Sequence, residues 1–282
     1  WKKRKNLNKG STADGDKVIY FNQAFHGRSG YTLTLTNTSD PRKTMYFPKF
    51  PWFKLDNPKL SFPITDEVLN NVISMEEDVI ENLKQIILEN KDDVAAIILE
   101  PIQGEGGDNH FRNEFMEILR FICDDNDILF IFDEVQTGIG ITGKMWAHEH
   151  FSVKPDIISF GKKAQVCGLL AGDRMNEVEM NVFKESSRLN STWGGNLVDM
   201  VRFTIYLEII AKEKLVDNAV ENGNYLMQKI QGIQDEYSDV VSNARGSGLF
   251  AAFDLPDTSK RDLLANLIIS EGALILGSGK KS

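Results

Sequence analysis

The stretch Ile128-Leu-Phe-Ile-Phe-Asp-Glu-Val-Gln-Thr-Gly138 is a continuous apolar run that ends in two acidic residues. Comparable runs occur at Val94–Leu99 and Asp156–Phe160, and Val18–Phe21 is a further predicted strand. A strand that is covered on both faces is apolar throughout, whereas a half-exposed strand alternates. These runs therefore predict an α/β fold with a mostly parallel central sheet and helices on both faces.

Helical periodicity fills the segments between the apolar runs. Apolar residues spaced three, four and seven positions apart predict a helix from about Thr65 to Asn90, in one or two pieces. A second helix is predicted over Phe111–Cys123, with its apolar residues on one side. Strands that alternate with helices in this way are typical of parallel sheets.

The sequence changes character after about Thr192. A long helical region is predicted over Leu197–Tyr237, with an interruption around Asn222–Gly223. The elements expected beyond it are a strand at Gly246–Phe253, a helix at about Ser259–Ser270 and a strand at Ala273–Leu276. This order predicts long connecting helices that lead into a smaller α+β unit.

Charge and composition exclude several classes of function. The 282 residues include 32 Lys and Arg against 41 Asp and Glu, a net charge of −9, whereas a nucleic-acid binder needs a dense basic face. The longest aliphatic run, Val94–Leu99, is far shorter than the roughly 20 residues of a membrane helix. Two cysteines, Cys123 and Cys167, are too few to cross-link a chain of this size, which favours a reducing, cytoplasmic compartment.

Polar residues follow three of the predicted strands directly. The three segments are Glu100-Pro-Ile-Gln-Gly-Glu-Gly-Gly107, Asp133-Glu-Val-Gln-Thr-Gly138 and Phe160-Gly-Lys-Lys163. Ligands of parallel α/β sheets bind beyond the carboxyl ends of the strands. Acidic and glycine-rich loops are common, but three successive strand ends that bring carboxylates, an amide and an amine to one rim favour a functional site.

An aspartate and a lysine at neighbouring strand ends are what a pyridoxal phosphate site needs. The aspartate keeps the pyridine nitrogen protonated, and the lysine forms the Schiff base. Asp133 and Lys162 have these positions, 29 residues apart across one crossover. Phe25 and His26 follow another strand and could stack on the cofactor ring, although an ordinary core role for Phe25 is equally compatible with the sequence.

Two other motifs point to different chemistry and are weaker. Gly138-Ile-Gly-Ile-Thr-Gly143 matches the dinucleotide pattern G-x-G-x-x-G, but Asp133 and Glu134 would repel a pyrophosphate and no clear βαβ unit follows. His148 and His150 are two residues apart, so on a helix they face different ways. We therefore expect packing or solvated histidines and no metal site.

At these residues the chain resembles the class III pyridoxal-phosphate-dependent aminotransferases. The motifs are Phe25–Tyr31, Glu100–Asp108, Asp133–Gly138, Phe160–Lys163 and Ser191–Asn196, in order over most of the chain. Within the class, Gly161–Gly168 and Arg188–Gly195 look more like the lysine 6-aminotransferases than the 4-aminobutyrate aminotransferases. The resemblance implies the type I fold of these enzymes, with a mostly parallel sheet and a smaller α+β C-terminal domain.

The resemblance also implies how the cofactor would be held. Lys162 would be the Schiff-base lysine, and Asp133 would bind the pyridine nitrogen of pyridoxal 5'-phosphate. Gln136 would reach the phenolic oxygen of the cofactor. Phe25 and His26 would form the turn that stacks on the ring.

Substrate and partner residues follow from the same resemblance. Arg28 would clamp the α-carboxylate of the substrate, with Gln136 nearby, as a bidentate partner. Glu105 would be a switch that masks a second arginine when lysine is bound and moves away for 2-oxoglutarate. Thr192 would contact the cofactor phosphate of the partner subunit, which implies a homodimer with a shared active site.

The activity implied is transfer of the ε-amino group of L-lysine to 2-oxoglutarate by ping-pong chemistry. The products would be 2-aminoadipate 6-semialdehyde and glutamate. An aminotransferase for 4-aminobutyrate or another ω-amine is the alternative in the same class. A fold relative without catalysis is the alternative from another class.

The expected organisation combines these points. A large cofactor-binding domain over 1–195, connecting helices over 196–238 and the start of a small domain over 239–282 are expected. The chain begins at Trp1 rather than Met and ends at Ser282 just after an apolar run. The family carries a phosphate-binding Ser-Gly segment before the first of these positions and the second arginine after the last. We therefore expect the 282 residues to be an interior fragment that is inactive alone.

Overall fold

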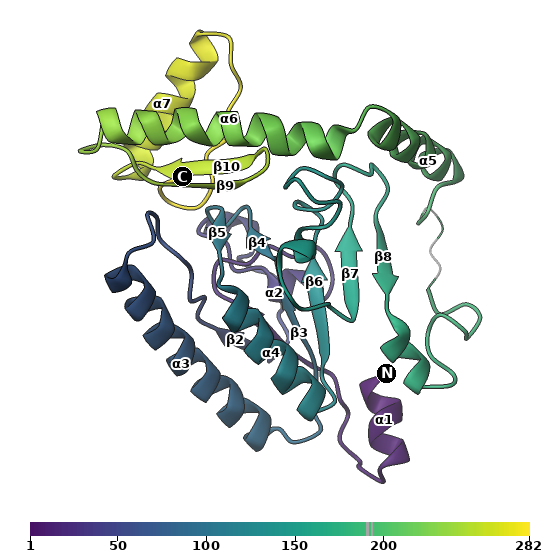
Figure 1. Ribbon diagram of the computed structural model, residues 1–282. Helices are drawn as coiled ribbons and strands as arrows, with labels where there is room; N and C mark the ends of the chain where they lie inside the picture. The colour runs from purple at the N-terminus through teal and green to yellow at the C-terminus, as the bar shows by residue number, and fades with distance from the viewer. Residues whose placement is uncertain (190–191, 193) are drawn as a thin grey trace.

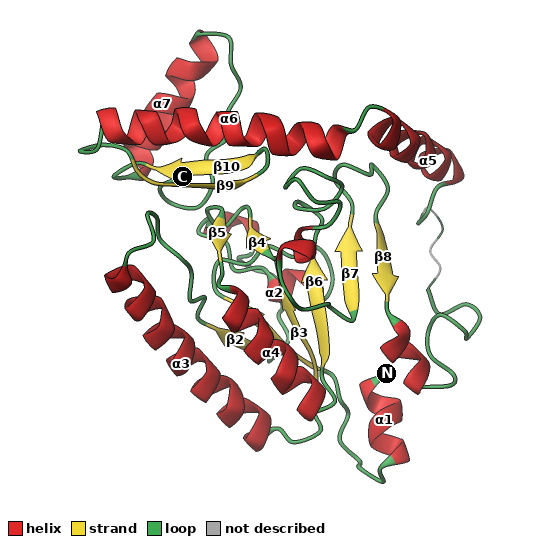
Figure 2. Ribbon diagram, viewed as in Figure 1, coloured by secondary structure: helices red, strands yellow, loops and turns green. Residues whose placement is uncertain are grey.

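The fold is described from a computed structural model, for residues 1–189, 192 and 194–282. A six-stranded sheet lies at its centre in the order β2-β1-β3-β6-β7-β8 (Figure 2). Its strands are β1 (Lys17–Phe21), β2 (Phe53–Leu55), β3 (Val94–Leu99), β6 (Leu129–Asp133), β7 (Ile157–Phe160) and β8 (Gly168–Ala171). All neighbouring pairs are parallel except β7 and β8. The prediction of a mostly parallel sheet is confirmed, whereas the edge strands β2 and β8 were not predicted.

The main hydrophobic core lies between this sheet and two helices. Helices α3 (Asp66–Glu89) and α4 (Asn113–Asp125) lie along one face (Figure 1). α3 is one continuous helix, and Thr65 caps it by accepting a hydrogen bond from the backbone N–H of Val68 at 3.2 Å. Fully buried core residues include Phe21, Leu83, Ile97, Phe115 and Phe130.

The opposite face of the sheet has a smaller cover. Successive residues of a strand point to opposite faces, so Ile97 belongs to the main core while Ala96 belongs to a second cluster. That cluster contains Met175, and Trp1 packs against it next to helix α1 (Lys2–Asn8). The sheet is therefore covered on both sides, as its continuous apolar strands require.

The C-terminal part of the chain forms a second unit above the sheet. Helix α5 (Leu197–Lys212) is followed by α6 (Leu215–Glu236), which runs across a hairpin of β9 (Ser242–Ser247) and β10 (Phe250–Asp254), with α7 (Thr258–Ser270) beyond it (Figure 1). The other elements are α2 (Thr32–Leu35), β4 (Ile102–Gln103), β5 (Asn109–His110) and the 3₁₀ helices η1 (Pro41–Lys43), η2 (Ala147–His150) and η3 (Asp173–Glu177). Within the described residues, no helix has the length and apolar character to cross a bilayer.

Three predictions in this part of the chain were wrong. The helical region breaks at Lys214, whose φ of +51° is left-handed, and not at Asn222–Gly223. The strand predicted over Gly246–Phe253 is a hairpin that turns at Gly248, where φ is +56°. The residues at 273–276 form no strand and are exposed, with Leu276 at 85%.

Gly223 lies inside α6 because the helix meets the hairpin turn there. A Cβ atom at Gly223 would lie 2.3 Å from the carbonyl carbon and oxygen of Gly248. Gly232, in the same helix, would place a Cβ in open space. Gly223, which suggests a helix break when the sequence is read alone, is therefore the point where the backbone of α6 contacts the backbone of the hairpin turn.

Substitution of these two glycines tests that contact. We expect Gly223→Ala to lower the free energy of unfolding by about 1–3 kcal/mol, because the new methyl overpacks a backbone contact. Gly232→Ala should raise it by up to about 1 kcal/mol, because alanine is the better helix former. Urea unfolding of the two variants measures both effects. Equal effects of the two substitutions would contradict the assignment.

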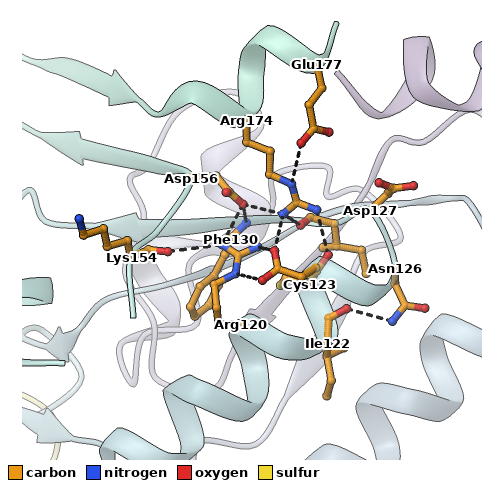
Figure 3. Close-up of polar contacts among 12 residues, drawn as sticks. Arg120, Ile122, Cys123, Asn126, Asp127, Phe130, Lys154, Asp156, Arg174 and Glu177 are labelled. Atoms are coloured by element: carbon orange, nitrogen blue, oxygen red, sulfur yellow. Dashed lines mark hydrogen bonds and ion pairs between the residues drawn. The ribbon is translucent and has the colours of Figure 1, made fainter. Parts of the chain in front are cut away.

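A polar cluster holds together the amino ends of β6 and β7 (Figure 3). Asp156 accepts hydrogen bonds from the backbone N–H of Phe130 at 2.7 Å, from Arg120 at 3.0 Å and from Arg174 at 3.1 Å. Arg174 also donates to the carbonyls of Ile128 and Cys123. This cluster joins α4, η3 and two strands at the end of the sheet opposite the polar strand ends, so its role is architectural.

Candidate active site

Four adjacent parallel strands end at one rim of the sheet. β1, β3, β6 and β7 are neighbours in that order, and each is followed by residues that the sequence singled out. Asp133 is the last residue of β6 and is paired in register with Ser159 of β7. The parallel order therefore brings Phe25, His26, Glu100, Asp133 and Lys162 to the same end of the sheet.

Asp133 is buried, with 7% of its surface exposed, and is held by three donors. His26 Nδ1 lies 2.8 Å from one carboxylate oxygen, and Ser159 Oγ and the backbone N–H of Val135 donate to the other at 3.0 and 3.1 Å. Burial alone would raise the pKa of this carboxyl, but these hydrogen bonds and the nearby His26 keep the pKa below its usual value. Asp133 is therefore an anion in a buried site.

The turn after β1 brings His26 and Phe25 to this carboxylate. The backbone N–H of His26 donates to Thr36 Oγ1 at 3.0 Å, and its Nε2 atom is buried without a protein partner. Phe25 is half-buried, and its backbone N–H donates to Glu100 Oε1 at 2.8 Å. Phe25 is thus fixed through its backbone, while its ring lies 5.8 Å from the Lys43 ammonium.

Lys162 and Gln136 meet between the ends of β6 and β7. Lys162 Nζ, which is on an exposed side chain, donates to Gln136 Oε1 at 2.8 Å. The neighbouring Lys163 donates to the backbone carbonyl of Gln136. Lys163 is partly buried, and desolvation together with the charge of Lys162 lowers the pKa of Lys163 to about 8. One glutamine is therefore held by two successive lysines.

Glu100 ties two site segments together. It follows β3, is 4% exposed, and accepts from the backbone N–H of Phe25 with one oxygen and from that of Gly104 at 3.1 Å with the other. Burial raises the pKa of Glu100 to about 7. The sequence pointed to this strand end but not to this residue, because its partners are distant in the chain.

The raised pKa of Glu100 predicts a pH-dependent stability. The folded protein keeps a proton that the unfolded chain releases between pH 4.5, the ordinary pKa, and about 7. The contribution of Glu100 to the free energy of unfolding therefore falls as the pH rises through this window, by at most about 1.4 kcal/mol per pH unit. In Glu100→Gln this fall should be absent. The free energy of unfolding of the variant should therefore rise relative to that of the wild type as the pH increases.

Urea unfolding of both proteins at several pH values between 5 and 8 measures the difference. Burial also raises the pKa of Glu76 to about 7, but that contribution is common to both proteins and cancels. Parallel stability curves for wild type and variant would contradict the prediction.

Glu105 lies in the loop between β4 and β5 and has partners that the sequence did not predict. Its Oε1 atom accepts from Thr38 Oγ1 at 2.7 Å and forms an ion pair with Lys43, while Oε2 is buried without a hydrogen bond. The backbone N–H of Gly279 donates to the Glu105 carbonyl at 2.8 Å. No local pattern marks Lys43, because it lies 62 residues before Glu105 in a polar surface segment.

Two predicted residues stand apart from these contacts. Arg28 lies in the turn after His26, and its side chain is exposed. Thr192 is exposed as well. The flanking Ser191 and Trp193 of the same motif lie outside the described residues. The roles expected for Arg28 and Thr192 therefore stay predictions.

The glycine-rich loop at 138–143 serves packing. A Cβ at Gly138 would lie 2.8 Å from the ring of Trp146, and one at Gly143 would lie 2.7 Å from Val220 of α6. Side chains of the protein itself therefore pack against these glycines, where a dinucleotide site would need the backbone open to a pyrophosphate. This packing supports the rejection of a dinucleotide site.

The acidic residue and the histidines around this loop are also bonded within the fold. Glu134 accepts from the backbone and ring of His148, both at 2.9 Å. His150 Nε2 lies 3.1 Å from the carbonyl of Thr142. Across the described part of the chain, no group of three or more His, Cys, Asp or Glu side chains could hold a metal ion.

Comparisons with known proteins point to one family. The sequence matches the family described as Aminotransferase class-III over residues 1–282. The L-lysine-epsilon aminotransferase of Mycobacterium tuberculosis is 46% identical over 280 residues, which cover 99% of this chain and 62% of that protein. A 4-aminobutyrate aminotransferase of Dictyostelium discoideum is 35% identical over 94% of this chain and 52% of that protein.

A solved structure of the M. tuberculosis lysine aminotransferase has the same fold. It superposes with a TM-score of 0.95 at 44% identity, and the match covers all of this chain and 64% of the solved one. The chain thus spans a little over three fifths of these M. tuberculosis relatives.

Proposed function

Because the chain belongs to the class III aminotransferases, we propose that it is the site-bearing part of a pyridoxal-phosphate-dependent L-lysine 6-aminotransferase. The enzyme would transfer the ε-amino group of L-lysine to 2-oxoglutarate and release 2-aminoadipate 6-semialdehyde and glutamate. The observation that carries the proposal is the buried anion of Asp133 beside the strand end that bears Lys162. The higher identity to a lysine enzyme than to a 4-aminobutyrate enzyme supports the choice of substrate.

The residues present fit pyridoxal phosphate. A protonated pyridine nitrogen needs a carboxylate that stays ionised when buried, and Asp133 has three donors that keep it so. A cofactor aldehyde needs an accessible amine, and Lys162 is exposed at the same rim. His26 Nε2 is a buried polar atom with no protein partner, as expected where a ligand completes the site.

Each of these residues would have a separate task in the reaction. Pyridoxal phosphate, when bound, supplies an electron sink for the reacting carbon. Asp133 would hold the proton on the ring nitrogen. Lys162 would anchor the cofactor and, once its amine is free, move the proton at the ε-carbon of lysine. Gln136, which accepts a hydrogen bond from Lys162, would orient that amine.

Substrate recognition would need a distant cation, because the ε-carbon has to reach the cofactor while the α-carboxylate stays away from it. Arg28 lies beyond the His26 turn and is exposed, so its guanidinium is free to make a bidentate contact with that carboxylate. Glu105 is linked to Phe25 through Lys43, whose ammonium pairs with the Glu105 carboxylate and lies 5.8 Å from the Phe25 ring. We assign Glu105 to discrimination between lysine and the acidic acceptor.

The proposed assembly is a homodimer with a shared active site. Helix α5 supports this because it buries no residue in one subunit and exposes apolar side chains such as Leu197 and Val201. Thr192, just before this helix, would reach the cofactor phosphate of the partner subunit. The proposed location is the cytoplasm, where cysteines such as the exposed Cys167 stay reduced.

Rates with two amine donors test the function. We expect kcat/KM of the full-length holoenzyme for L-lysine, with 2-oxoglutarate as acceptor, to exceed that for 4-aminobutyrate by at least about 100-fold. A substrate whose chain length or charges do not match the site is bound more weakly in the transition state. A preference for 4-aminobutyrate would contradict the lysine assignment. The lack of any cofactor absorbance band in the full-length protein purified in the presence of pyridoxal phosphate would favour a relative without catalysis.

A further inference from the structure

The loop that carries Glu105 is held from two sides. On the large-domain side, Glu100 accepts from the backbone N–H of Gly104, and Gln23 Nε2 donates to the carbonyl of Gly106 at 3.3 Å. A Cβ at Gly106 would lie 2.3 Å from the carbonyl oxygen of Gln23, so the backbones of Gly106 and Gln23 are in close contact on that side. On the other side it meets the β9–β10 hairpin and the residues after α7 (Figure 1).

Arg245 of β9 makes the central contact on that second side. Its Nε donates to the carbonyl of Asp108 at 2.7 Å, and Nη2 donates to the carbonyl of Gly107. Nη2 also reaches Ser282 Oγ at 2.6 Å. Nη1 donates to the carbonyl of Asn243 at 2.6 Å and pairs with Asp254 at 2.9 Å. The five contacts match the five N–H donors of a guanidinium.

The arrangement requires arginine specifically. The side chain of Arg245 is 2% exposed, so each unpaired donor would be costly. A lysine could pair with Asp254, but its single ammonium group lacks the planar set of N–H donors that reaches the carbonyls of Gly107 and Asp108 at the same time. Burial and the charge of Arg245 lower the pKa of the adjacent His110 to about 4, so this ring is neutral and adds no repulsion at neutral pH.

We propose that Arg245 is a positioning residue for Glu105, which it holds in the site by fastening the loop at 104–108 to the β9–β10 hairpin. The two loop carbonyls that Arg245 binds, those of Gly107 and Asp108, follow Glu105 by two and three residues, with only glycines between. Without Arg245, the loop loses its central contact with the hairpin, and its glycines allow it to move on that side. The Glu105 carboxylate then loses its fixed approach to Thr38 and Lys43. The inference rests on the proposed function, in which Glu105 separates the lysine step from the acceptor step.

The test substitution is Arg245→Lys, measured in the two half-reactions of the holoenzyme. We expect KM for 2-oxoglutarate to change by about tenfold, while the rate constant for the lysine half-reaction stays within about twofold. Hydrogen exchange at the backbone amides of 104–108 should become about tenfold faster. The exchange measurement does not depend on the substrate, so a wrong substrate assignment and a wrong role for Arg245 give different results.

Two variants control for a purely structural effect. Arg120→Lys makes the same change in the polar cluster at the opposite end of the sheet and should lower the melting temperature without changing the ratio of the two half-reactions (Figure 3). Asp254→Asn removes the ion pair of Arg245 but keeps its contacts with the loop, and should also leave that ratio unchanged.

The outcomes that would overturn the proposal are equal changes in both half-reactions or unchanged exchange at 104–108. If Arg245→Lys does not fold, Ser278→Ala removes a single hydrogen bond of 3.2 Å between Ser278 Oγ and Asp108. It should shift KM for 2-oxoglutarate in the same direction by about twofold. No shift in a folded Ser278→Ala variant would count against the proposal.

Discussion

Replacement of Lys162 by alanine should reduce transamination by about 10⁴-fold or more, the upper range for loss of a general acid–base group, because the proposed covalent anchor of the cofactor would be lost as well. Lys162 is the exposed amine beside Gln136 at the end of β7. Single-turnover measurements with L-lysine follow the loss directly. The absorbance of the purified variant should also change, since the cofactor would be held without a covalent bond.

Lys163→Met provides the matched control for this result. Lys163 is the neighbouring amine, and it binds the carbonyl of Gln136 instead of its side chain. We expect Lys163→Met to reduce the rate by about tenfold at most, through looser positioning of Gln136. An inactive Lys163→Met with an active Lys162→Ala would exchange the roles of the two lysines.

Asp133→Asn should reduce kcat/KM for L-lysine by about 10³-fold, as expected when a buried charge that stabilises the transition state is removed. The amide retains the size of the side chain but cannot hold a proton on a ring nitrogen. Because hydrogen bonds and the nearby His26 keep the pKa of Asp133 below its usual value, the wild-type carboxylate is ionised throughout the neutral range, and the defect should be the same across that range.

Ser159→Ala distinguishes the effect of the Asp133 charge from the effect of a single hydrogen bond to that carboxylate. It removes one donor to Asp133 at 3.0 Å and leaves the carboxylate and the contact with His26 in place. We expect a loss of about tenfold or less. Steady-state kinetics of both variants provide the comparison, and an Asp133→Asn rate within tenfold of wild type would contradict the role of the charge.

The sheet and its main core could be predicted because they depend on local patterns. The runs at Val94–Leu99 and Ile128–Phe132 are apolar on both faces, and each forms a parallel strand within one residue of the prediction. The glycine positions could not be interpreted locally. Gly223 looks like a helix break, but it meets Gly248 across the fold, and Lys214 breaks the helix instead without any sequence signal.

The positions of the candidate site residues were predictable where a strand end places the residue, and not where its partners come from far along the chain. Asp133 and Lys162 follow directly from parallel strands. Glu100 binds a backbone group 75 residues away, and Arg245 binds one 137 residues away. These partners depend on how the turn after β1 and the β9–β10 hairpin pack against the sheet, which residue spacing does not encode.

The most direct test of the central claim follows the amino nitrogen itself. The holoenzyme would be incubated with 2-oxoglutarate and with L-lysine labelled with ¹⁵N at either the ε- or the α-position, and the glutamate formed would be analysed by mass spectrometry. The proposed function predicts ¹⁵N-glutamate from ε-labelled lysine and unlabelled glutamate from α-labelled lysine. Label transferred from the α-position, or no labelled glutamate from either substrate, would contradict it.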